Sequence, residues 1–297
     1  MENKNNPSFP ILLLAVLSLI WGTSFILMKK GLVALTPVEV AALRITVAGI
    51  LVFPIAVVKW KEVKREQVGK LLISGLLGVF IPAFLFTTAQ KHIDSSVAGI
   101  LNTLSPLWTL IMGVLFYKQI FRRPAILGIL VGLAGTVLLM LSRSGGSVIG
   151  FNAYGLLIVL ACAFYGTNLN FVKFNITQLG SLAITSVSIA LIGPLGALVL
   201  FGMTDFVQHL QTVPGAWTAA GYVALLALMS TAIAGLIFNK LVRITTPIYA
   251  SMVTYIMPLV SVMWGVLDGE HLYAGHFIGM AAILGGVYLA NRRTMNE

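Results

Sequence analysis

Long apolar stretches alternate with short polar segments along the whole chain. Each stretch is about 20 residues long and holds few charged residues, which is the length that an α-helix needs to cross the hydrocarbon core of a bilayer. The connections between the stretches are short, so no soluble domain is inserted. The pattern predicts an all-α integral membrane protein with ten transmembrane helices. They are expected over residues 9–28, 38–58, 69–89, 95–116, 124–142, 152–172, 181–202, 216–239, 246–266 and 273–291.

A motif of the first apolar stretch recurs in the sixth. The residues W-G-T-S at 21–24 are followed 144 positions later by Y-G-T-N at 165–168. The residues N-T-L-S-P at 102–106 similarly match T-Y-I-M-P at 254–258. Similarity at a nearly constant offset is the sign of an internal repeat. We therefore predict a first five-helix repeat over residues 1–143, a connecting loop over 144–151 with a flexible Gly-rich segment, and a second five-helix repeat over 152–297.

Five helices in each repeat have a consequence for topology. Because five is odd, the second repeat enters the membrane from the opposite side, and such inverted repeats are typical of secondary transporters. Fourteen of the Lys and Arg residues fall in segments on the side of the two termini, and four fall on the other side. Positive charge is enriched in cytoplasmic segments. The sequence thus predicts a multi-pass protein of the cell inner (plasma) membrane with both termini cytoplasmic.

The composition excludes several classes of protein. Apolar residues make up 58% of the chain and charged residues 9%, and the mean hydropathy is +0.97, far from the values of soluble domains. The net charge of +10 comes from cations grouped between apolar stretches, which is typical of membrane orientation and not of nucleic-acid binding. One cysteine, Cys162, and four scattered histidines provide neither a disulfide framework nor metal-ligand spacing. We expect no metal and no cofactor.

Polar and aromatic residues inside the predicted helices are candidates for a binding site, because their desolvation must be compensated. Trp21 and Ser24 lie on one helix face, and Tyr165 and Asn168 are their equivalents in the sixth helix. We hypothesise that such residues line a central cavity between the repeats, where rings supply contact area and polar groups orient a head group. The alternative is that they only join helices to one another. The candidate substrate-binding residues are Trp21, Ser24, Phe84, Asn102, Tyr165, Asn168, Thr254 and Tyr255.

A second set of residues has a gating or a structural role. Among the prolines inside the predicted helices, four are singled out, because each removes a backbone hydrogen bond and favours a kink. Kinks at these positions serve either as gates or for packing, and the sequence favours neither interpretation. Arg44, in the second helix, is either a counter-ion for the substrate or an interfacial residue that meets Glu39, and the structural role is preferred. The four prolines are Pro82, Pro106, Pro194 and Pro258.

Two further patterns limit the mechanism. All nine carboxylates lie in tails, connections or helix ends, so the membrane-buried acid common in proton-driven transporters is missing, which favours facilitated diffusion or exchange. No phosphate-binding loop, His-Glu-x-x-His motif or nucleophile set is found, so we expect no enzyme. Glycines of the fifth helix (Gly128, Gly132, Gly135) and of the tenth (Gly279, Gly285, Gly286) form small-residue faces. Packing within one chain is preferred for them over a homodimer.

These features resemble the drug/metabolite transporter superfamily, specifically its EamA-type permeases, over nearly the whole chain. The first half departs from the family pattern at Lys118, where members often carry Glu; the second half keeps that acid as Glu270. The matching residues are Trp21 to Phe25, Arg44, Ser105, Pro106, Gly113, Pro258, Leu259, Gly265, Asp268, Gly269, Glu270 and Gly279.

The resemblance implies an inner-membrane permease, often an exporter, with a central cavity that opens alternately to each side. The aromatic and amide character of the candidate site favours small metabolites such as amino acids or amines. A membrane-embedded enzyme or lipid-handling protein is the alternative, and it would need a reactive group near Asp268, Glu270 and His271. A passive scaffold would explain the apolar composition but not the repeat. The expected partners are a small-molecule substrate and the lipid bilayer.

Overall fold

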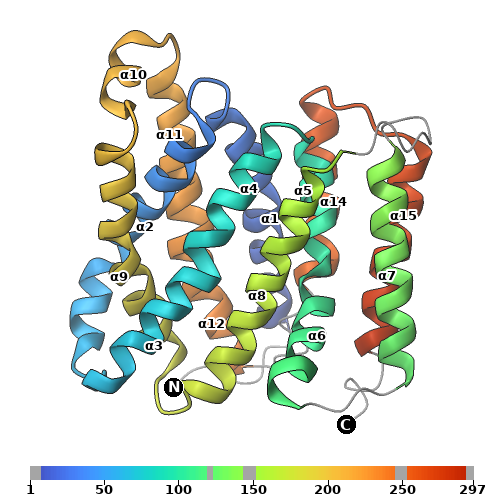
Figure 1. Cartoon of the computed structure of the whole chain (residues 1–297), viewed down its shortest axis with the longest axis horizontal. Coiled ribbons are helices and arrows are strands. Elements are labelled where there is room, and N and C mark those ends of the chain that lie inside the picture. The colour runs from blue at the N-terminus through green and yellow to red at the C-terminus, as the bar shows by residue number, and fades with distance from the viewer. Residues whose placement is uncertain (1–7, 119–122, 143–151, 245–252, 292–297) are drawn as a thin grey trace.

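The computed structural model describes residues 8–118, 123–142, 152–244 and 253–291, and every regular element in these ranges is helical (Figure 1). The predicted connecting loop, residues 144–151, lies entirely outside these ranges, and the side chain of Tyr255 is not described. The α-helices are α1 (Ser8–Gly31), α2 (Pro37–Trp60), α3 (Arg65–Gly75), α4 (Ile81–Gln90), α5 (Ser95–Leu101), α6 (Ser105–Tyr117), α7 (Arg123–Ser142), α8 (Gly155–Asn175), α9 (Ser181–Gly202), α10 (Phe206–Thr212), α11 (Ala216–Leu226), α12 (Ala234–Ile244), α14 (Val253–Leu267) and α15 (Ala274–Asn291).

Among the described residues, seven helical segments are long and apolar enough to cross a membrane. Their outward faces carry large exposed apolar side chains, such as Ile50 (67% exposed) and Leu198 (63% exposed). Exposed apolar area on this scale is stable only in lipid. The chain is therefore a multi-pass membrane protein. The seven segments are Phe9–Gly31, Pro37–Trp60, Arg65–Gln90, Ser95–Tyr117, Gly155–Asn175, Ser181–Gly202 and Ala216–Phe238, and the apolar helices α7, α14 and α15 lie beside them.

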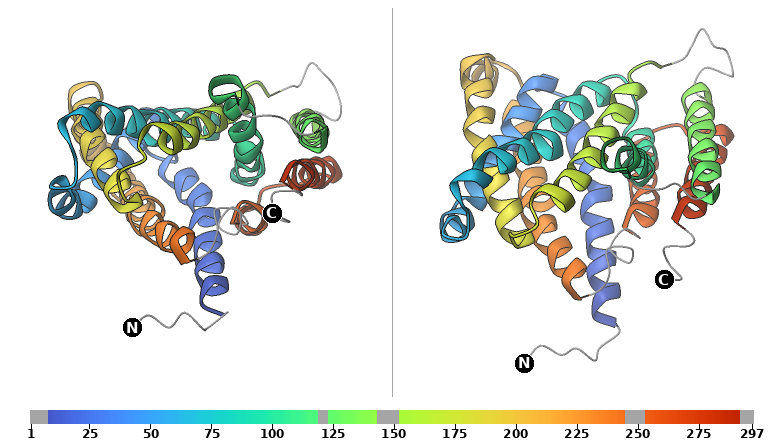
Figure 2. Two further views of the ribbon diagram at one scale, coloured as in Figure 1. Left: turned by 90° about the horizontal axis from the view of Figure 1, so that it is seen from below. Right: turned by 60° about the horizontal axis from the view of Figure 1, so that its bottom comes forward.

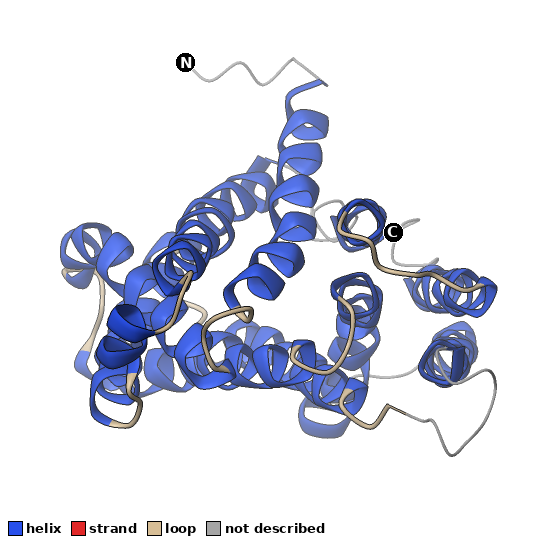
Figure 3. Cartoon of the chain, turned by 90° about the horizontal axis from the view of Figure 1, so that it is seen from above, coloured by secondary structure: helices blue, strands red, loops and turns tan. Residues whose placement is uncertain are grey.

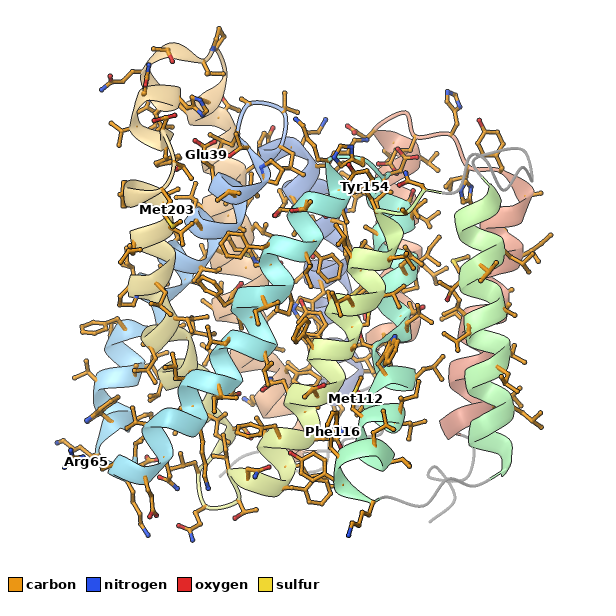
Figure 4. The ribbon with its side chains drawn as sticks, in the orientation of Figure 1. Glu39, Arg65, Met112, Phe116, Tyr154 and Met203 are labelled. Atoms are coloured by element: carbon orange, nitrogen blue, oxygen red, sulfur yellow. The ribbon has the colours of Figure 1, made fainter. Side chains whose placement is uncertain are left out.

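The helices run between two ends of the molecule. In Figure 1 the lower end holds the first turn of α1, the α2–α3 connection and the last turn of α15. The upper end holds the α1–α2, α4–α5 and α14–α15 connections and the short helix α10. Figure 4 accordingly shows Glu39 and Tyr154 at the upper end and Arg65 at the lower end. The cations of the α2–α3 connection thus lie at the same end of the molecule as the start of α1 and the end of α15.

Helices that are distant in sequence pack against one another. The most extensive pairs are α2 with α9 and α7 with α15, followed by α6 with α8 and α1 with α14. Seen from below and from above, α7 and α15 form a pair at one edge of the molecule, apart from the other helices (Figures 2 and 3). As predicted, the small-residue faces of α7 and α15 meet within the chain, because a Cβ on Gly135 would lie 2.8 Å from the Gly279 carbonyl oxygen.

Three irregular turns interrupt the membrane-crossing helices in the part of the chain that the structure describes. The π-helical turn η1 (Leu76–Phe80) separates α3 from α4, and a second one, η4 (Ala227–Ile233), separates α11 from α12. The 3₁₀ turn η2 (Asn102–Leu104) separates α5 from α6. Pro82 and Pro106 are the second residues of α4 and α6, the helices that follow η1 and η2, whereas Pro194 and Pro258 lie inside continuous helices. Two of the four prolines thus coincide with a break in regular α-helical structure.

Candidate functional site

The glycine of each repeated motif marks a close helix crossing. A Cβ on Gly22 of α1 would lie 2.5 Å from the Val260 Cβ of α14. A Cβ on Gly166 of α8 would lie 2.6 Å from the backbone nitrogen of Thr109 on α6. No larger residue fits at either position without separating the helices. The motif therefore brings its neighbouring aromatic and polar side chains into the interior, where α1 and α8 cross other helices.

The flanking motif residues contact the two π-helical turns. The Trp21 Nε1 donates a hydrogen bond to the backbone oxygen of Ser230 in η4 at 3.0 Å. Asn168 packs its amide against Gly78 in η1, at a place that only a glycine leaves open. A π-helical turn widens the helix and is frequently found at functional sites. The repeated motif thus positions one polar side chain on each of the two irregular turns.

The other predicted binding residues take different positions. The Ser24 hydroxyl donates to the Trp21 backbone oxygen at 2.5 Å, and the Asn102 amide approaches the Met257 sulfur at 3.9 Å. Tyr165 stacks on Phe86 with ring centroids 6.1 Å apart, and Phe84 lies 5.0 Å from Phe80 by the same measure.

Within the described part of the predicted set, only Ser24 and Trp21 share a hydrogen bond. Thr254 is half-buried in α14 and Pro258 is buried in the same helix, while Pro106 is the second residue of α6. The structure therefore distributes the predicted set over α1, η2, α4, α6, α8 and α14. It does not gather these side chains into one directly bonded cluster.

Besides the Gln90 Oε1 at the end of α4, four uncharged polar atoms of the described membrane-crossing helices are buried without a hydrogen-bond partner. They belong to Trp108 (Nε1), Asn168 (Oδ1), Ser188 (Oγ) and Ser230 (Oγ). Buried polar groups nearly always find partners, and the cost of leaving one unpaired is highest where no water is present. Such atoms are thus available to a polar ligand. Only Asn168 was among the predicted residues; the sequence showed the other three as polar positions in apolar stretches, without the helix contacts that bury them.

Arg44 does not meet Glu39, contrary to the preferred interpretation of the sequence. Glu39 accepts hydrogen bonds from the Thr36 backbone nitrogen (2.8 Å) and hydroxyl (3.0 Å), and its other oxygen lies 2.8 Å from the His209 Nδ1 of α10. Glu39 thus completes a capping box at the start of α2 and ties α10 to it. The Arg44 Nε instead donates to the Thr231 hydroxyl in η4 at 3.4 Å.

A buried carboxylate joins separate segments at the upper end. Glu270, in the α14–α15 connection, accepts hydrogen bonds from the backbone nitrogens of Ser95 (2.9 Å) and Ser96 (3.0 Å) and from both hydroxyls, at 2.7 and 2.5 Å. It therefore caps the N-terminus of α5 from another part of the chain. The Lys29 Nζ of α1 lies 2.8 Å from Glu270 and 2.7 Å from Asp268, and Lys30 pairs with Asp268 as well. Three separate segments are thus held together by these charges.

The electrostatics of this cluster follow from its contacts. Burial alone would raise the pKa of the Glu270 carboxyl, but the hydrogen bonds from Lys29, Ser96 and Ser95 outweigh that effect and lower the pKa to about 2. Hydrogen bonds from Lys29 and Lys30 also lower the pKa of Asp268. Both carboxylates are therefore ionised at neutral pH. Gly265, one of the residues that match the EamA-type pattern, is explained by a local contact. Because glycine has no Cβ, it leaves room for the Glu270 side chain.

Two lysines at the lower end occupy the positions that correspond to Glu270 and Lys29 at the upper end. Lys118 corresponds to Glu270 by sequence offset, and it is exposed at the end of α6 with a left-handed backbone (φ 54°). Lys173, the counterpart of Lys29, lies over the Phe174 ring at 5.2 Å. In the described ranges, neither lysine has a carboxylate partner. The tie at the upper end therefore has no equivalent between these positions at the lower end.

Comparison with known proteins agrees with a membrane transporter. The chain is 24% identical over 287 residues to an "Uncharacterized transporter" of Archaeoglobus fulgidus, covering 95% of this chain and 98% of that one. It is 27% identical to the "Uncharacterized inner membrane transporter YedA" of Escherichia coli K12 (93% and 88% covered). It is also 25% identical to a "Probable amino-acid metabolite efflux pump" of Salmonella typhimurium (91% and 90% covered).

Fold and family comparisons cover almost all of the molecule. A solved crystal structure, with 20% sequence identity, superimposes with a TM-score of 0.60 over 98% of this chain and 100% of the other, which shows a shared fold. The sequence model of the EamA-like transporter family matches twice, over residues 8–141 and over residues 153–292. The chain belongs to the EamA-like transporter family.

Proposed function

We propose that this protein is a secondary transporter, an exporter or facilitator, that moves small metabolites such as amino acids or amines by alternating access. Its site lies between two five-helix repeats of inverted topology in the inner membrane, and both termini face the cytoplasm. The observation that carries this proposal is the arrangement at η1 and η4. There the repeated motif directs Asn168 and Trp21 onto two irregular turns, and polar atoms of Asn168 and Ser230 are left without partners in the interior.

Reciprocal helix contacts support the inverted repeat. Gly135 of α7 faces Gly279 of α15, and Gly286 of α15 faces Gly128 of α7, where a Cβ would lie 2.5 Å from the carbonyl oxygen. By position in the two repeats, Gly128 corresponds to Gly279 and Gly135 corresponds to Gly286. The two contacts are therefore equivalent when the repeats are exchanged, which is the pattern of an approximate two-fold relationship. The crossings of α1 with α14 and of α8 with α6 are related in the same way through Gly22 and Gly166. The two family matches fall on the same two parts of the chain.

Alternating access needs one end to close while the other opens. The cluster of Glu270, Asp268, Lys29 and Lys30 ties α1, α5 and the α14–α15 connection together at the upper end. At the lower end Lys118 and Lys173 do not form such a tie. We infer that the structure represents a state closed at the upper end, and that opening this end requires the Glu270 contacts to break.

The alternative of a membrane-embedded enzyme or lipid-handling protein loses its candidate reactive group. Asp268 and Glu270 are occupied by lysines and by the N-terminus of α5, and the side chain of His271 is exposed beside them. These contacts explain the acidic residues of this connection by helix capping and ion pairing. The homologues are named as transporters, which also favours transport over catalysis.

The proposal is tested by binding and flux. Purified protein is screened by thermal shift with amino acids, amines and organic acids, since a ligand that binds only the folded state raises the apparent stability. The same compounds are then assayed for flux in proteoliposomes. We expect at least one compound to be transported, and its flux to be lost in Asn102→Leu and Tyr165→Leu while both variants fold. Absence of flux for every compound would contradict the transport function.

A further inference from the structure

Arg44 directs its charge into the membrane interior. It lies about 10 Å along α2 from the upper end, at 1.5 Å per residue from Pro37. Its Nε donates to the Thr231 hydroxyl at 3.4 Å, and Thr231 lies about 20 Å along the neighbouring helix from Ala216 at the same end. The guanidinium therefore points toward the middle of the bilayer and does not extend to the upper interface, as a snorkelling arginine would.

No acid of the described chain neutralises this charge. Glu39 is engaged by Thr36 and His209, and Asp268 and Glu270 are engaged by Lys29 and Lys30. No ion pair joins Arg44 to any of the other described carboxylates, which lie at the helix ends. The remaining acids, Glu2 and Glu297, belong to the chain termini outside the described residues. The other described carboxylates are Glu62, Glu66, Asp94 and Asp205.

An unpaired cation inside a bilayer is costly, and charged residues there usually mark a substrate or ion pathway. A guanidinium has five N–H donors, and Arg44 uses one of them, in a long bond to a neutral hydroxyl. The surroundings are polar and incompletely paired. Ser230, next to Thr231 in η4, has an unpartnered hydroxyl, and the Tyr165 hydroxyl of α8 lies within electrostatic range of Arg44.

We propose that Arg44 is the anion-recognition group of the transport site and that the transported solute carries a carboxylate. The carboxylate binds the free edge of the guanidinium through two parallel N–H···O bonds, the geometry that arginine forms best. Thr231 holds the guanidinium in place, and the hydroxyls of Ser230 and Tyr165 supply further hydrogen bonds. The inference rests on the proposed transport function and narrows it, because simple amines are then excluded as substrates.

The test uses matched sets of solutes that differ only in the charged groups. One set is phenylalanine, phenylethylamine and 3-phenylpropanoate, and the other is leucine, isopentylamine and 4-methylpentanoate. Flux into proteoliposomes and thermal stabilisation are measured for wild type, Arg44→Gln and Arg44→Lys. The control is Arg65→Gln, which removes an exposed cation at the lower end (Figure 4). Comparing the amino acid with the carboxylate alone shows whether the solute also needs its amine.

We expect only solutes with a carboxylate to be transported. Arg44→Gln should raise their half-saturating concentration at least tenfold, because a charge-assisted hydrogen bond contributes about 1.5–3 kcal/mol. Arg44→Lys should restore part of the affinity, and Arg65→Gln should behave as wild type. Equal flux of an amine and its amino acid, or unchanged affinity in Arg44→Gln, would overturn the inference while leaving transport intact. Absence of flux for every solute would remove the transport function and this inference with it.

Discussion

Gly49 of α2 and Gly193 of α9 face each other where their helices cross, and a Cβ added to Gly49 would lie 2.7 Å from the Gly193 Cα. The two positions are 144 residues apart, the same offset that separates the repeated motifs. A residue that contacts its own repeat counterpart lies on the approximate two-fold axis. This crossing therefore joins the two proposed repeats at their centre.

The crossing tolerates no side chain on Gly49, because the atom it would meet is backbone. We expect Gly49→Ala to destabilise the protein by about 1–3 kcal/mol, the usual cost of overpacking. Gly193→Ala should cost less, because its Cβ would lie 3.1 Å from Gly49. The measurement is thermal unfolding of purified protein in detergent.

The matched control is Gly221→Ala on α11. A Cβ at Gly221 would meet nothing within 4 Å, so the change adds only helix propensity and should be neutral or slightly stabilising. If Gly49→Ala and Gly221→Ala unfold at the same temperature, the close approach of α2 and α9 is not a constraint on the fold.

The charge cluster at the upper end gives a second prediction. Glu270→Gln removes the charge that caps α5 and binds Lys29, and it should cost about 2 kcal/mol or more, because hydrogen bonds to a buried charge are lost. Glu62→Gln is the control: it removes an acid that pairs with Lys59 at 2.5 Å on the surface, where such pairs contribute little. Equal effects of the two substitutions in thermal unfolding would argue against a structural tie.

The contribution of Glu270 should depend on pH in a defined window. The folded-state pKa of about 2 is below the ordinary value of 4.5, so the unfolded chain takes up the proton first as the pH falls. The stabilisation is therefore complete above about pH 4.5 and is lost between that value and pH 2. The difference in unfolding temperature between wild type and Glu270→Gln should shrink over this window. A difference that stays constant down to pH 2 would contradict the ionised cap.

Membrane orientation gives a third prediction. The wild-type Cys162 is fully buried, so the native protein should react poorly with a membrane-impermeant maleimide. Cysteines are introduced at two exposed positions, Gln208 on α10 at the upper end and Glu66 on α3 at the lower end. In intact cells we expect labelling of Gln208→Cys alone, with Glu66→Cys reacting only after permeabilisation. The reverse pattern would place the termini outside the cytoplasm.

The sequence predicted the fold well where the signal is local. Apolar stretches of helical length predicted the membrane-crossing helices to within a few residues, because lipid leaves a spanning chain few alternatives to a helix. It could not predict η1, η2 and η4, which divide three of those helices, since π-helical and 3₁₀ turns have no strong sequence pattern. Two prolines, Pro82 and Pro106, partly indicated where two of these breaks lie, because they follow η1 and η2 closely.

The candidate site was harder to predict, because its contacts join positions far apart in sequence. Trp21 and Asn168 were found through the repeat, but their contacts with Ser230 and Gly78 depend on helix crossing angles. The role of Glu270 was open in the sequence; its partners Ser95 and Ser96 lie about 175 positions away. Arg44 was expected at the interface because only its position along α2 could be seen, not the direction of its side chain.

Two asparagines on α8 provide the sharpest test of the proposed site. The Asn170 amide donates to the Thr109 (2.8 Å) and Gly166 (2.9 Å) backbone oxygens, which joins α8 to α6. Asn168 forms no such bond, and its Oδ1 is buried without a partner. Replacing an unpaired buried polar group with an apolar one of similar shape is neutral or stabilising, whereas removing a paired donor costs about 1–3 kcal/mol.

Asn168→Leu should therefore abolish transport while leaving the unfolding temperature unchanged or higher. Asn170→Leu should lower the unfolding temperature, because the two backbone oxygens lose their donor. The two substitutions are chemically identical and two residues apart on one helix, but Asn170 is buried with bonded partners whereas Asn168 is half-buried with an unpartnered Oδ1. Loss of transport together with a gain in stability is the signature of a group reserved for a ligand. If Asn168→Leu is destabilised as much as Asn170→Leu, the Asn168 side chain serves the fold and the site must be sought elsewhere.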